Sequence, residues 1–289
     1  NARQDCLDES FGSWRQRRGS DDGDPRMTLT SLTPLEQTLR AKRDAGRKLL
    51  VPYVTGGLKG WTDAIRAAAA NGADVIEIGL PFSDPVMDGP IIQQASQQAL
   101  DDGATPISIL EGVRTLDVDV PLVVMCYYNT VHHAGHERFA SQLFQAGIVG
   151  AIIPDLPLEE SGPWCAAADA VGLSTIMLAA PTAPDERLPR VCARARGFVY
   201  SVGLLGVTGE RTELAATASQ LAGRLKKITD VPVIIGVGVS NSAQAVEACK
   251  VADGIVQGAS VVRRLMEGGP DAVGAYVAEV REAIDSASV

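Results

Sequence analysis

The chain has 289 residues, 46% of them hydrophobic and 21% charged, which is enough to bury the core of one large domain or two ordinary ones. Its formal net charge of -9 argues against nucleic acid or an anionic membrane surface as a partner, and no apolar run approaches the roughly 20 residues of a membrane span. Five scattered cysteines without a C-x-x-C pair argue against a disulfide framework or a zinc knuckle, so we expect a cytoplasmic protein.

The N-terminal stretch differs in composition from the rest. Residues 1–28 are rich in Asp, Arg, Gly and Ser and show no apolar period, so we expect a flexible tail, within which Met27 is an alternative start. We expect residues 29–289 to form a single domain. Its first predicted element is a helix over 34–45.

From residue 30 onward, eight short apolar runs alternate with helical patterns, which is typical of consecutive βαβ units on a parallel sheet. The predicted strands are 49–55, 75–78, 122–126, 151–153, 174–178, 198–202, 233–237 and 254–256. The segments NGADVIEIG (71–79) and KVADGIVQG (250–258) resemble each other, as two copies of one helix-to-strand joint would. Eight such units favour an α/β fold, a (β/α)8 TIM barrel with an extra N-terminal helix; the alternative is an open doubly wound sheet.

Three helix starts are predicted between the strands. Thr105 is the expected cap of a helix with Pro106 at its first position, Thr182 precedes Pro184 at another start, and residues 240–242 open a third helix.

Glycine-rich loops follow the sixth, seventh and eighth predicted strands, at residues 206–209, 236–240 and 258–260. Barrels of this type bind phosphate in the loops after the last strands, through backbone N–H groups and helix N-termini. We therefore expect a phosphate site there, although such glycines can also simply end strands. A dinucleotide site is disfavoured, because GVGVSN (236–241) lacks the third glycine of that motif.

Glu77 is a polar residue in an apolar strand. Strand alternation places it on one face with Val75 and Gly79, and we expect this face to point into the barrel near its carboxyl end. Burial would then raise the pKa of Glu77 toward neutrality, as a general acid/base needs. The alternative is a structural glutamate paired with an arginine.

Asp84 and Asp88 lie in the loop that follows, which Pro81, Pro85 and Pro90 restrain. Either aspartate is a candidate cap for the helix predicted just beyond.

Other chemistries find less support. The six lysines fall in predicted helices, at joints or in the first loop, so none is placed for imine chemistry. His132, His133 and His136 lack a further ligand nearby and are interpreted as part of a polar loop rather than a metal site, and Cys126 has no clear base unless one of them serves. We expect carboxylate chemistry with no metal and no organic cofactor.

From about residue 30 to its end, the chain resembles the α subunit family of tryptophan synthase. The most specific match is ADVIEIGLPFSDPVMDGP (73–90). The supporting matches, in the family's order, are VPYVTGG (51–57), MCYYNTV (125–131), IIPDLP (152–157), GFVYSVGLLGVTG (197–209), IIGVGVS (234–240) and DGIVQGAS (253–260).

The resemblance implies a lyase of tryptophan biosynthesis, which cleaves indole-3-glycerol phosphate by a retro-aldol reaction to indole and glyceraldehyde 3-phosphate. Glu77 matches the family's catalytic glutamate, a general acid/base on the glycerol side chain and at indole C3. Asp88 matches the catalytic aspartate that accepts a hydrogen bond from the indole NH.

The same resemblance implies the substrate and partner contacts. The positions that match substrate-binding residues are Tyr53, Thr55, Tyr127, Asn129, Tyr200 and Thr208. Those that match phosphate-binding positions are Gly209, Gly238, Gly258 and Ala259. In the family the α subunit binds a pyridoxal-phosphate β subunit in an α2β2 heterotetramer, and Asp84 matches a residue of that contact region.

Three departures from the family's pattern bear on function. Ala259 stands where the family usually has Ser, Thr130 replaces a common proline, and Leu204-Leu205 replace residues that are often polar. They leave two alternatives open beside the synthase subunit. One is a stand-alone lyase paralogue of a secondary pathway, and the other is a weakly active activator of a β subunit.

Overall fold

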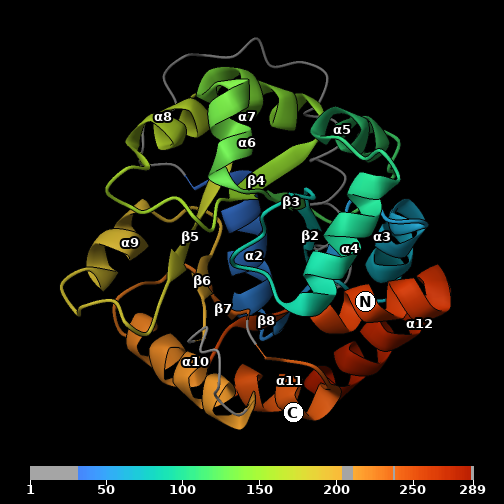
Figure 1. Cartoon of the computed structure of the whole chain (residues 1–289). Helices are drawn as coiled ribbons and strands as arrows, with labels where there is room; N and C mark the ends of the chain where they lie inside the picture. The colour runs from blue at the N-terminus through green and yellow to red at the C-terminus, as the bar shows by residue number, and fades with distance from the viewer. Residues whose placement is uncertain (1–31, 204–210, 237, 288–289) are drawn as a thin grey trace, which may run out of the picture. The chain divides into compact units, whose positions relative to one another are not determined.

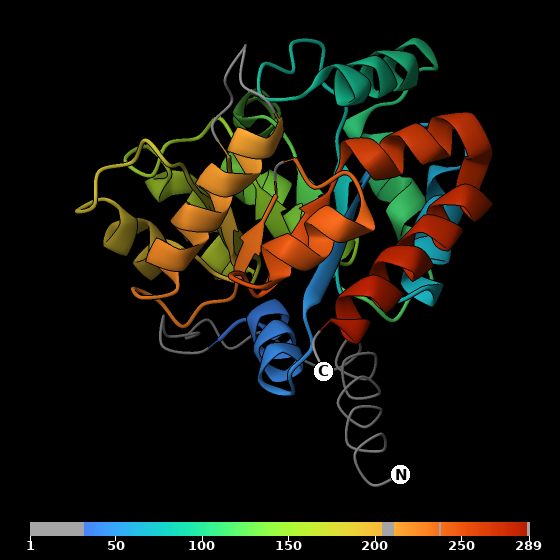
Figure 2. The same ribbon diagram turned by 90° about the horizontal axis from the view of Figure 1, so that it is seen from below.

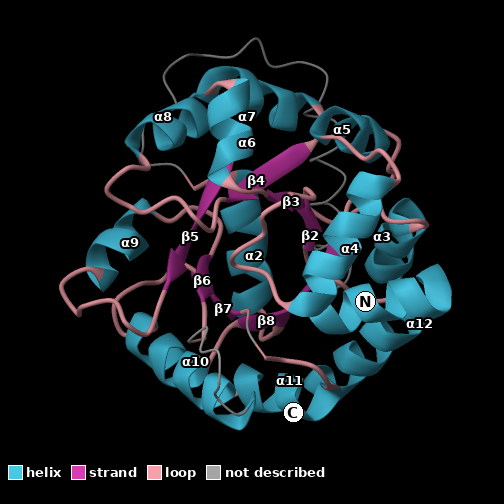
Figure 3. Ribbon diagram, viewed as in Figure 1, coloured by secondary structure: helices cyan, strands magenta, loops and turns pink. Residues whose placement is uncertain are grey.

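The computed structural model describes residues 32–203, 211–236 and 238–287. Eight parallel strands pair in chain order, β1 to β8, and β8 pairs with β1, so the sheet is a closed barrel. The strands are β1 (Leu49–Thr55), β2 (Ile76–Gly79), β3 (Leu122–Met125), β4 (Ile148–Ile152), β5 (Ser174–Ala179), β6 (Val199–Ser201), β7 (Val233–Ile235) and β8 (Gly254–Gln257). In Figure 1 the strands form an inner ring, and the secondary-structure colours of Figure 3 separate this ring from the helices around it.

The helices follow the strands as β/α units require, with two helices after β2 and two after β3. The described helices are α2 (Pro34–Asp44), α3 (Trp61–Ala70), α4 (Pro90–Asp101), α5 (Pro106–Arg114), α6 (Tyr128–Ala134), α7 (His136–Gln145), α8 (Gly162–Ala170), α9 (Leu188–Arg194), α10 (Arg211–Leu225), α11 (Ser242–Cys249) and α12 (Ala259–Ser286). Gly269 and Pro270 interrupt α12, because Gly269 has φ 73° and proline cannot donate a helical hydrogen bond. Among the described residues, no helix is both long enough and apolar enough to cross a membrane.

The strand register determines which side chains share the inner face. Tyr53 pairs with Glu77 and Glu77 with Val123, while Gly79 pairs with Met125. Paired residues in neighbouring strands point to the same side of the sheet, so these side chains form successive layers inside the barrel. Most of this interior is apolar and buried, which makes the inward glutamate an exception.

Helix α2 closes the amino-terminal end of the barrel. Thr33 caps it by accepting a hydrogen bond from Glu36 N, and Pro34 occupies the first turn. The Ser174 hydroxyl, at the start of β5, donates to Thr33 Oγ1 at 2.7 Å. In Figure 1 α2 lies within the ring of strands, and Figure 2 shows it at the end opposite to α4.

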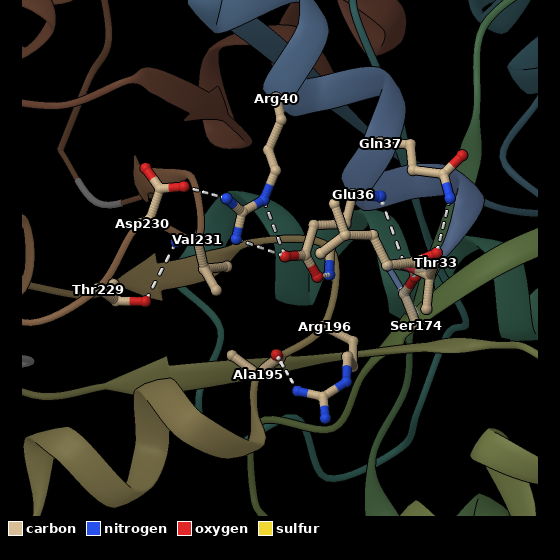
Figure 4. Close-up of polar contacts among 12 residues, drawn as sticks. Thr33, Glu36, Gln37, Arg40, Ser174, Ala195, Arg196, Thr229, Asp230 and Val231 are labelled. Atoms are coloured by element: carbon tan, nitrogen blue, oxygen red, sulfur yellow. Dashed lines mark hydrogen bonds and ion pairs between the residues drawn. The ribbon is translucent and has the colours of Figure 1, made fainter. Parts of the chain in front are cut away.

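A hydrogen bond and ion pairs attach α2 to the segments that lead into β6 and β7, and Figure 4 shows the contacts of Arg40 and Glu36. The buried Glu36 carboxylate accepts Arg40 Nε at 3.0 Å and the backbone N–H of Gly197 at 3.2 Å. Arg40 also pairs with Asp230, and the Arg43 guanidinium donates to Asp230 O at 2.6 Å. These contacts join residues about 160 to 190 positions apart in the chain, so α2 is an integral part of the barrel.

The two similar joints seen in the sequence are equivalent in structure. Before β2, Asp74 Oδ2 accepts Leu50 N at 2.9 Å, and Asp74 N donates to Leu50 O. Before β8, Asp253 Oδ2 accepts Val233 N at 2.8 Å, and Asp253 N donates to Val233 O. Each aspartate thus satisfies the backbone of the preceding strand at the same end of the barrel.

The predicted barrel is confirmed and the open sheet is excluded. All eight predicted strands are present, with bounds within three residues of those expected, and the first helix and the cap Thr105 are also found. The helix start predicted at residues 240–242 is confirmed as well, with Asn241 as its cap. The start predicted at Thr182 is wrong: residues 181–187 form turns and bends, and α9 begins at Leu188. Pro189 lies in the first turn of α9, whereas a helix started at Thr182 would carry it in its interior. The predicted tail lies outside the described residues, so the domain bounds stay a prediction.

Candidate active site

Glu77 lies in β2 with its side chain inside the barrel. The residue is 3% exposed, and among the described residues Oε2 has no hydrogen-bond partner. Burial raises the pKa of Glu77 to about 8, and the negative charge of Asp88 adds to the rise. The alternative of a structural glutamate paired with arginine finds no ion pair in the described part of the chain. At neutral pH Glu77 is therefore a neutral acid with a proton to donate.

Asp88 lies at the end of the loop that leads from β2 to α4. Its Oδ2 accepts a hydrogen bond from the Tyr127 hydroxyl at 3.1 Å. Burial raises the pKa of Asp88 to about 6, and the bond from Tyr127 opposes that rise. Neither Asp88 nor Asp84 caps α4, because its N-cap is Gly89. Asp88 is thus a half-buried carboxylate that is mostly ionised at pH 7.

Asp84 lies in the same loop but on the outside of the protein. It is exposed and accepts a hydrogen bond from the Ser83 hydroxyl at 2.6 Å. Two positions further on, Val86 is 78% exposed, the largest value among the large hydrophobic side chains of the described residues. The loop therefore has an inner end at Asp88 and an outer tip around Asp84.

Two tyrosines line the barrel interior beside Glu77, and each covers a glycine. The hydroxyl oxygen of Tyr53 lies 1.8 Å from the place that a Cβ of Gly79 would occupy. The ring of Tyr200 approaches the corresponding place on Gly236 equally closely, and its hydroxyl donates to Gly236 O at 3.3 Å. Burial raises the pKa of both tyrosines well above the usual value, so both stay protonated donors.

The remaining predicted contacts fall into three groups. Thr55 Oγ1 is buried on the face of Tyr53 and has no hydrogen-bond partner among the described residues. Tyr127 is 2% exposed and its hydroxyl is used within the protein, while Asn129 is exposed on the first turn of α6. Thr208 and Gly209 lie outside the described residues.

The predicted phosphate positions lie where the last two β/α loops begin. Gly238 has φ 80°, a backbone conformation that favours glycine, and Gly258 is the N-cap of α12. Ala259, the first residue of α12, is exposed, whereas Ser260 is buried with its Oγ unpaired in the described structure. What these loops offer is backbone N–H groups at a helix N-terminus.

The histidines are helical, so their interpretation as a polar loop is wrong. His132 and His133 belong to α6 and His136 begins α7, because Gly135, with φ 84°, ends one helix and starts the next. His136 Nε2 lies 3.1 Å from the Tyr128 hydroxyl. In the described part of the chain, no group of three or more His, Cys, Asp and Glu residues is placed to hold a metal ion.

Among the described residues, cysteine and lysine offer no nucleophile to this site. Cys126 is fully buried, and burial raises the pKa of its thiol far above the usual value. The six lysines lie in helices, at their ends, just before β1 or in the loop after β1.

Sequence reasoning missed three residues that shape the site. Phe82 stacks on the Tyr127 ring, with centroids 5.0 Å apart, and Gly79 and Gly236 make room for the two tyrosines. The alternation in β2 already placed Gly79 above Glu77 and could have predicted its role. No local sequence pattern predicts the contact between Phe82 and Tyr127, because the two residues come from different loops.

The chain is similar in sequence and in structure to proteins of known family. A family model described as tryptophan synthase alpha chain matches residues 39–286. The alpha chain of Streptomyces coelicolor is 42% identical over 245 residues, covering 83% of this chain and 90% of that one. The alpha chain of Thermobifida fusca is 43% identical over 247 residues, covering 83% and 91%.

Solved structures agree with the sequence relatives. A structure of tryptophan synthase from Mycobacterium tuberculosis has a TM-score of 0.81 at 36% identity, over 88% of this chain and 99% of that chain. Tryptophan synthase subunit alpha from Legionella pneumophila has a TM-score of 0.79 at 30% identity, over 89% and 100%.

Proposed function

The chain belongs to the tryptophan synthase alpha chain family, and we propose that it is a carbon-carbon lyase that cleaves indole-3-glycerol phosphate to indole and glyceraldehyde 3-phosphate. The observation that carries this proposal is Glu77, a buried and unpaired carboxyl group inside the barrel beside Asp88. The two sequence relatives and the Legionella pneumophila structure named above carry the alpha chain or subunit name, and none of them favours the stand-alone lyase or the activator.

Glu77 performs the proton transfers. With a pKa of about 8 it is protonated at neutral pH and can donate its proton to indole C3. The carboxylate that remains accepts the proton of the glycerol hydroxyl next to the ring, as the C–C bond breaks and the aldehyde forms. The electron pair of that bond returns to the protonated ring, so one side chain serves in turn as acid and base.

Asp88 supports the positive charge that the ring carries after protonation at C3. Because its pKa is about 6, it is ionised at pH 7 and can accept a hydrogen bond from the indole NH. The protonated ring is itself the electron acceptor for bond cleavage, so the mechanism needs no imine-forming lysine. Two neighbouring carboxyl groups with separated pKa values thus hold the two roles.

The phosphate group of the substrate is assigned to the loops after β6, β7 and β8. Gly238 and Gly258 supply backbone N–H groups without a side chain in the way, and the N-terminus of α12 adds its favourable dipole. Gly209 and Thr208 belong to the same proposal but lie outside the described residues. Backbone binding explains how a protein of net charge -9 can hold an anion.

A tryptophan synthase β subunit is the proposed partner, with Asp84 and the exposed tip around it as the contact. A cytoplasmic location completes the proposal, in keeping with the four described cysteines, all of which are free thiols.

The test is indole release from purified indole-3-glycerol phosphate, with and without a β subunit. We expect release in both cases and stimulation by the partner. The rate should show a bell-shaped pH dependence, falling below about pH 6 as Asp88 gains a proton and above about pH 8 as Glu77 loses one. No release under either condition would refute the proposed activity, and fast release without any stimulation would refute the partner.

A further inference from the structure

Tyr127 contacts the loop between β2 and α4 at three points. Its hydroxyl accepts a hydrogen bond from Met87 N at 3.0 Å and donates one to Asp88 Oδ2 at 3.1 Å. Its ring stacks on Phe82, with centroids 5.0 Å apart and planes inclined by 26°. The contacts lie on both sides of the exposed tip, with Phe82 before it and Met87 and Asp88 after it.

These contacts use the hydroxyl of Tyr127 within the protein. A tyrosine hydroxyl has one hydrogen to donate, and here Asp88 receives it. The side chain is 2% exposed, so little of it is left to touch a ligand. The family resemblance implies a substrate-binding residue at this position, whereas the geometry indicates one that acts on another side chain.

We propose that Tyr127 is a positioning residue that holds the Asp88 carboxylate toward the substrate and favours its ionised form. The inference rests on the proposed function for the identity of the substrate. Among the described residues, Tyr127 is the one whose side chain is hydrogen-bonded to the Asp88 carboxylate. The bond from Met87 N fixes the hydroxyl oxygen in turn, so its hydrogen is directed at Asp88.

The other groups that face Asp88 cannot perform this task. Glu77 from β2 stays protonated over the pH range in which Asp88 titrates, and among the described residues no hydrogen bond joins it to Asp88. Tyr53 from β1 and Tyr200 from β6 are close enough to interact with the charge of Asp88, but their hydroxyls are not hydrogen-bonded to it in the described structure. Burial raises the pKa of Asp88, and the bond from Tyr127 counteracts it.

Tyr127→Phe tests this inference, because it removes the hydroxyl and keeps the ring that stacks on Phe82. The direct readout is the titration of the Asp88 carboxyl carbon by NMR in protein labelled at aspartate Cγ, with the signal assigned by its loss in Asp88→Asn. We expect the midpoint to rise by about one pH unit, the size of effect that one hydrogen bond to a charged group supports. The acid limb of kcat/KM should move with it, giving about fivefold loss at pH 6 and much less at pH 8.

The matched control is Tyr276→Phe. Tyr276 is also buried, but it lies on α12, outside the barrel. Its hydroxyl accepts a hydrogen bond from Gln257 Nε2 at 2.8 Å. Its removal should leave the Asp88 midpoint unchanged. A fluorinated tyrosine at position 127, whose hydroxyl is a stronger donor, should lower the midpoint; it also tests the inference if Tyr127→Phe fails to fold.

The outcomes separate this inference from the proposed function. An unchanged Asp88 midpoint in Tyr127→Phe would overturn the inference, even if activity fell equally at every pH, since that pattern indicates a structural role alone. A shifted midpoint in a protein that releases no indole would uphold the action of Tyr127 on Asp88 and refute the proposed reaction.

Discussion

The two ends of the barrel hold buried carboxylates in opposite ways. At the amino-terminal end, Asp74 is fully buried and both of its carboxylate oxygens have hydrogen-bond donors. Oδ1 accepts hydrogen bonds from Lys42 at 2.9 Å and Arg47 at 2.7 Å, and Oδ2 accepts one from Leu50 N at 2.9 Å. Three residues further along the chain, Glu77 is equally buried but has an oxygen without a partner. A buried carboxylate that is surrounded by donors stays ionised and links neighbouring segments of the fold. A buried carboxyl group without donors stays protonated and can transfer its proton.

The same contrast separates whole clusters. Glu36 and Asp253 at the amino-terminal end pair with Arg40 and Lys226, and both also accept a backbone N–H. At the other end, Asp88 receives a neutral tyrosine hydroxyl in place of a cation. This separation of stability from chemistry is the general arrangement of such barrels, whose active sites lie at the carboxyl ends of the strands. It predicts that substitutions at the two ends will affect different quantities.

The largest effect is expected from Glu77→Gln. Without the acid/base group, kcat should fall by about 10³-fold, within the range of general acid–base catalysis, while substrate binding changes little. The measurement is indole release at saturating substrate, with a binding titration beside it. Turnover near the wild-type rate would contradict the role assigned to Glu77.

The same variant should become more stable than the wild type as the pH rises. The folded-state pKa of about 8 lies above the ordinary value of 4.5, so the unfolded chain releases a proton across this window that the folded protein keeps. The free energy of unfolding of the wild type therefore decreases between about pH 4.5 and 8. Glutamine does not titrate, so the variant lacks this decrease. Urea unfolding at pH 5 and pH 8 should show the advantage of Glu77→Gln growing with pH; an equal difference at both values would contradict it.

Asp74→Asn should lower the stability and leave the rate unchanged, whereas Glu77→Gln mainly lowers the rate. Its replacement leaves Lys42, Arg47 and Arg281 around a neutral amide, and breaking a buried ion pair typically destabilises by about 3 kcal/mol or more. The kcat of the folded protein should stay unchanged.

The equivalent variant at the second joint sharpens this prediction. Asp253 pairs with one cation, Lys226, so Asp253→Asn should destabilise less than Asp74→Asn does. Both effects are measured by urea unfolding at pH 7. A loss of kcat without a loss of stability in Asp74→Asn would break the separation between the two ends.

Gly79→Ala should disturb the site with a smaller effect on rate. The new methyl group would lie 1.8 Å from the present position of the Tyr53 hydroxyl oxygen, so that ring must move. We expect kcat/KM to fall about 10- to 100-fold, as displacements near 1 Å do in active sites. The overpacked ring should also lower the stability, and adding Tyr53→Leu, which shortens the side chain above the methyl group, should restore part of that loss.

Gly162→Ala is the control for Gly79→Ala. A Cβ at Gly162 would meet nothing within 4 Å, so this variant should match the wild type in rate and stability. Equal rates for the wild type, Gly79→Ala and Gly162→Ala would show that the position of the Tyr53 ring has no influence on the reaction.

The predictable part of the fold was its local part. The composition of residues 49–55 was enough to predict a strand there, and the alternation within β2 was enough to predict that the Glu77 side chain points inward. The start of α9 was missed because Thr182 and Pro184 carry helix-start chemistry as strong as that of Pro189. Which of two such signals prevails depends on packing, which a short window of sequence does not contain.

The site was predictable to a similar degree. The carboxylates could be found from their position after a buried strand, together with the family resemblance. The protonation state of Asp88 could not, because its pKa depends on how deeply the folded loop buries it and on the bond from Tyr127, a residue 39 positions away. The seating of α2 is beyond local reasoning for the same reason, since Glu36 meets Gly197 from the far half of the chain.

The smallest effect is expected from Ala259→Ser. The carboxyl-terminal end binds phosphate, on our proposal, through backbone groups alone, and position 259 is exposed at the start of α12. A hydroxyl there adds one hydrogen bond to the anion and should tighten the binding of glycerol phosphate by about 1 kcal/mol, measured as its inhibition constant. Ser260→Ala is the matched control: its hydroxyl is buried and unpaired in the described structure, so its loss should leave inhibition unchanged. If Ser260→Ala weakened inhibition and Ala259→Ser did not strengthen it, phosphate would contact the buried hydroxyl, and the backbone-only site would be wrong.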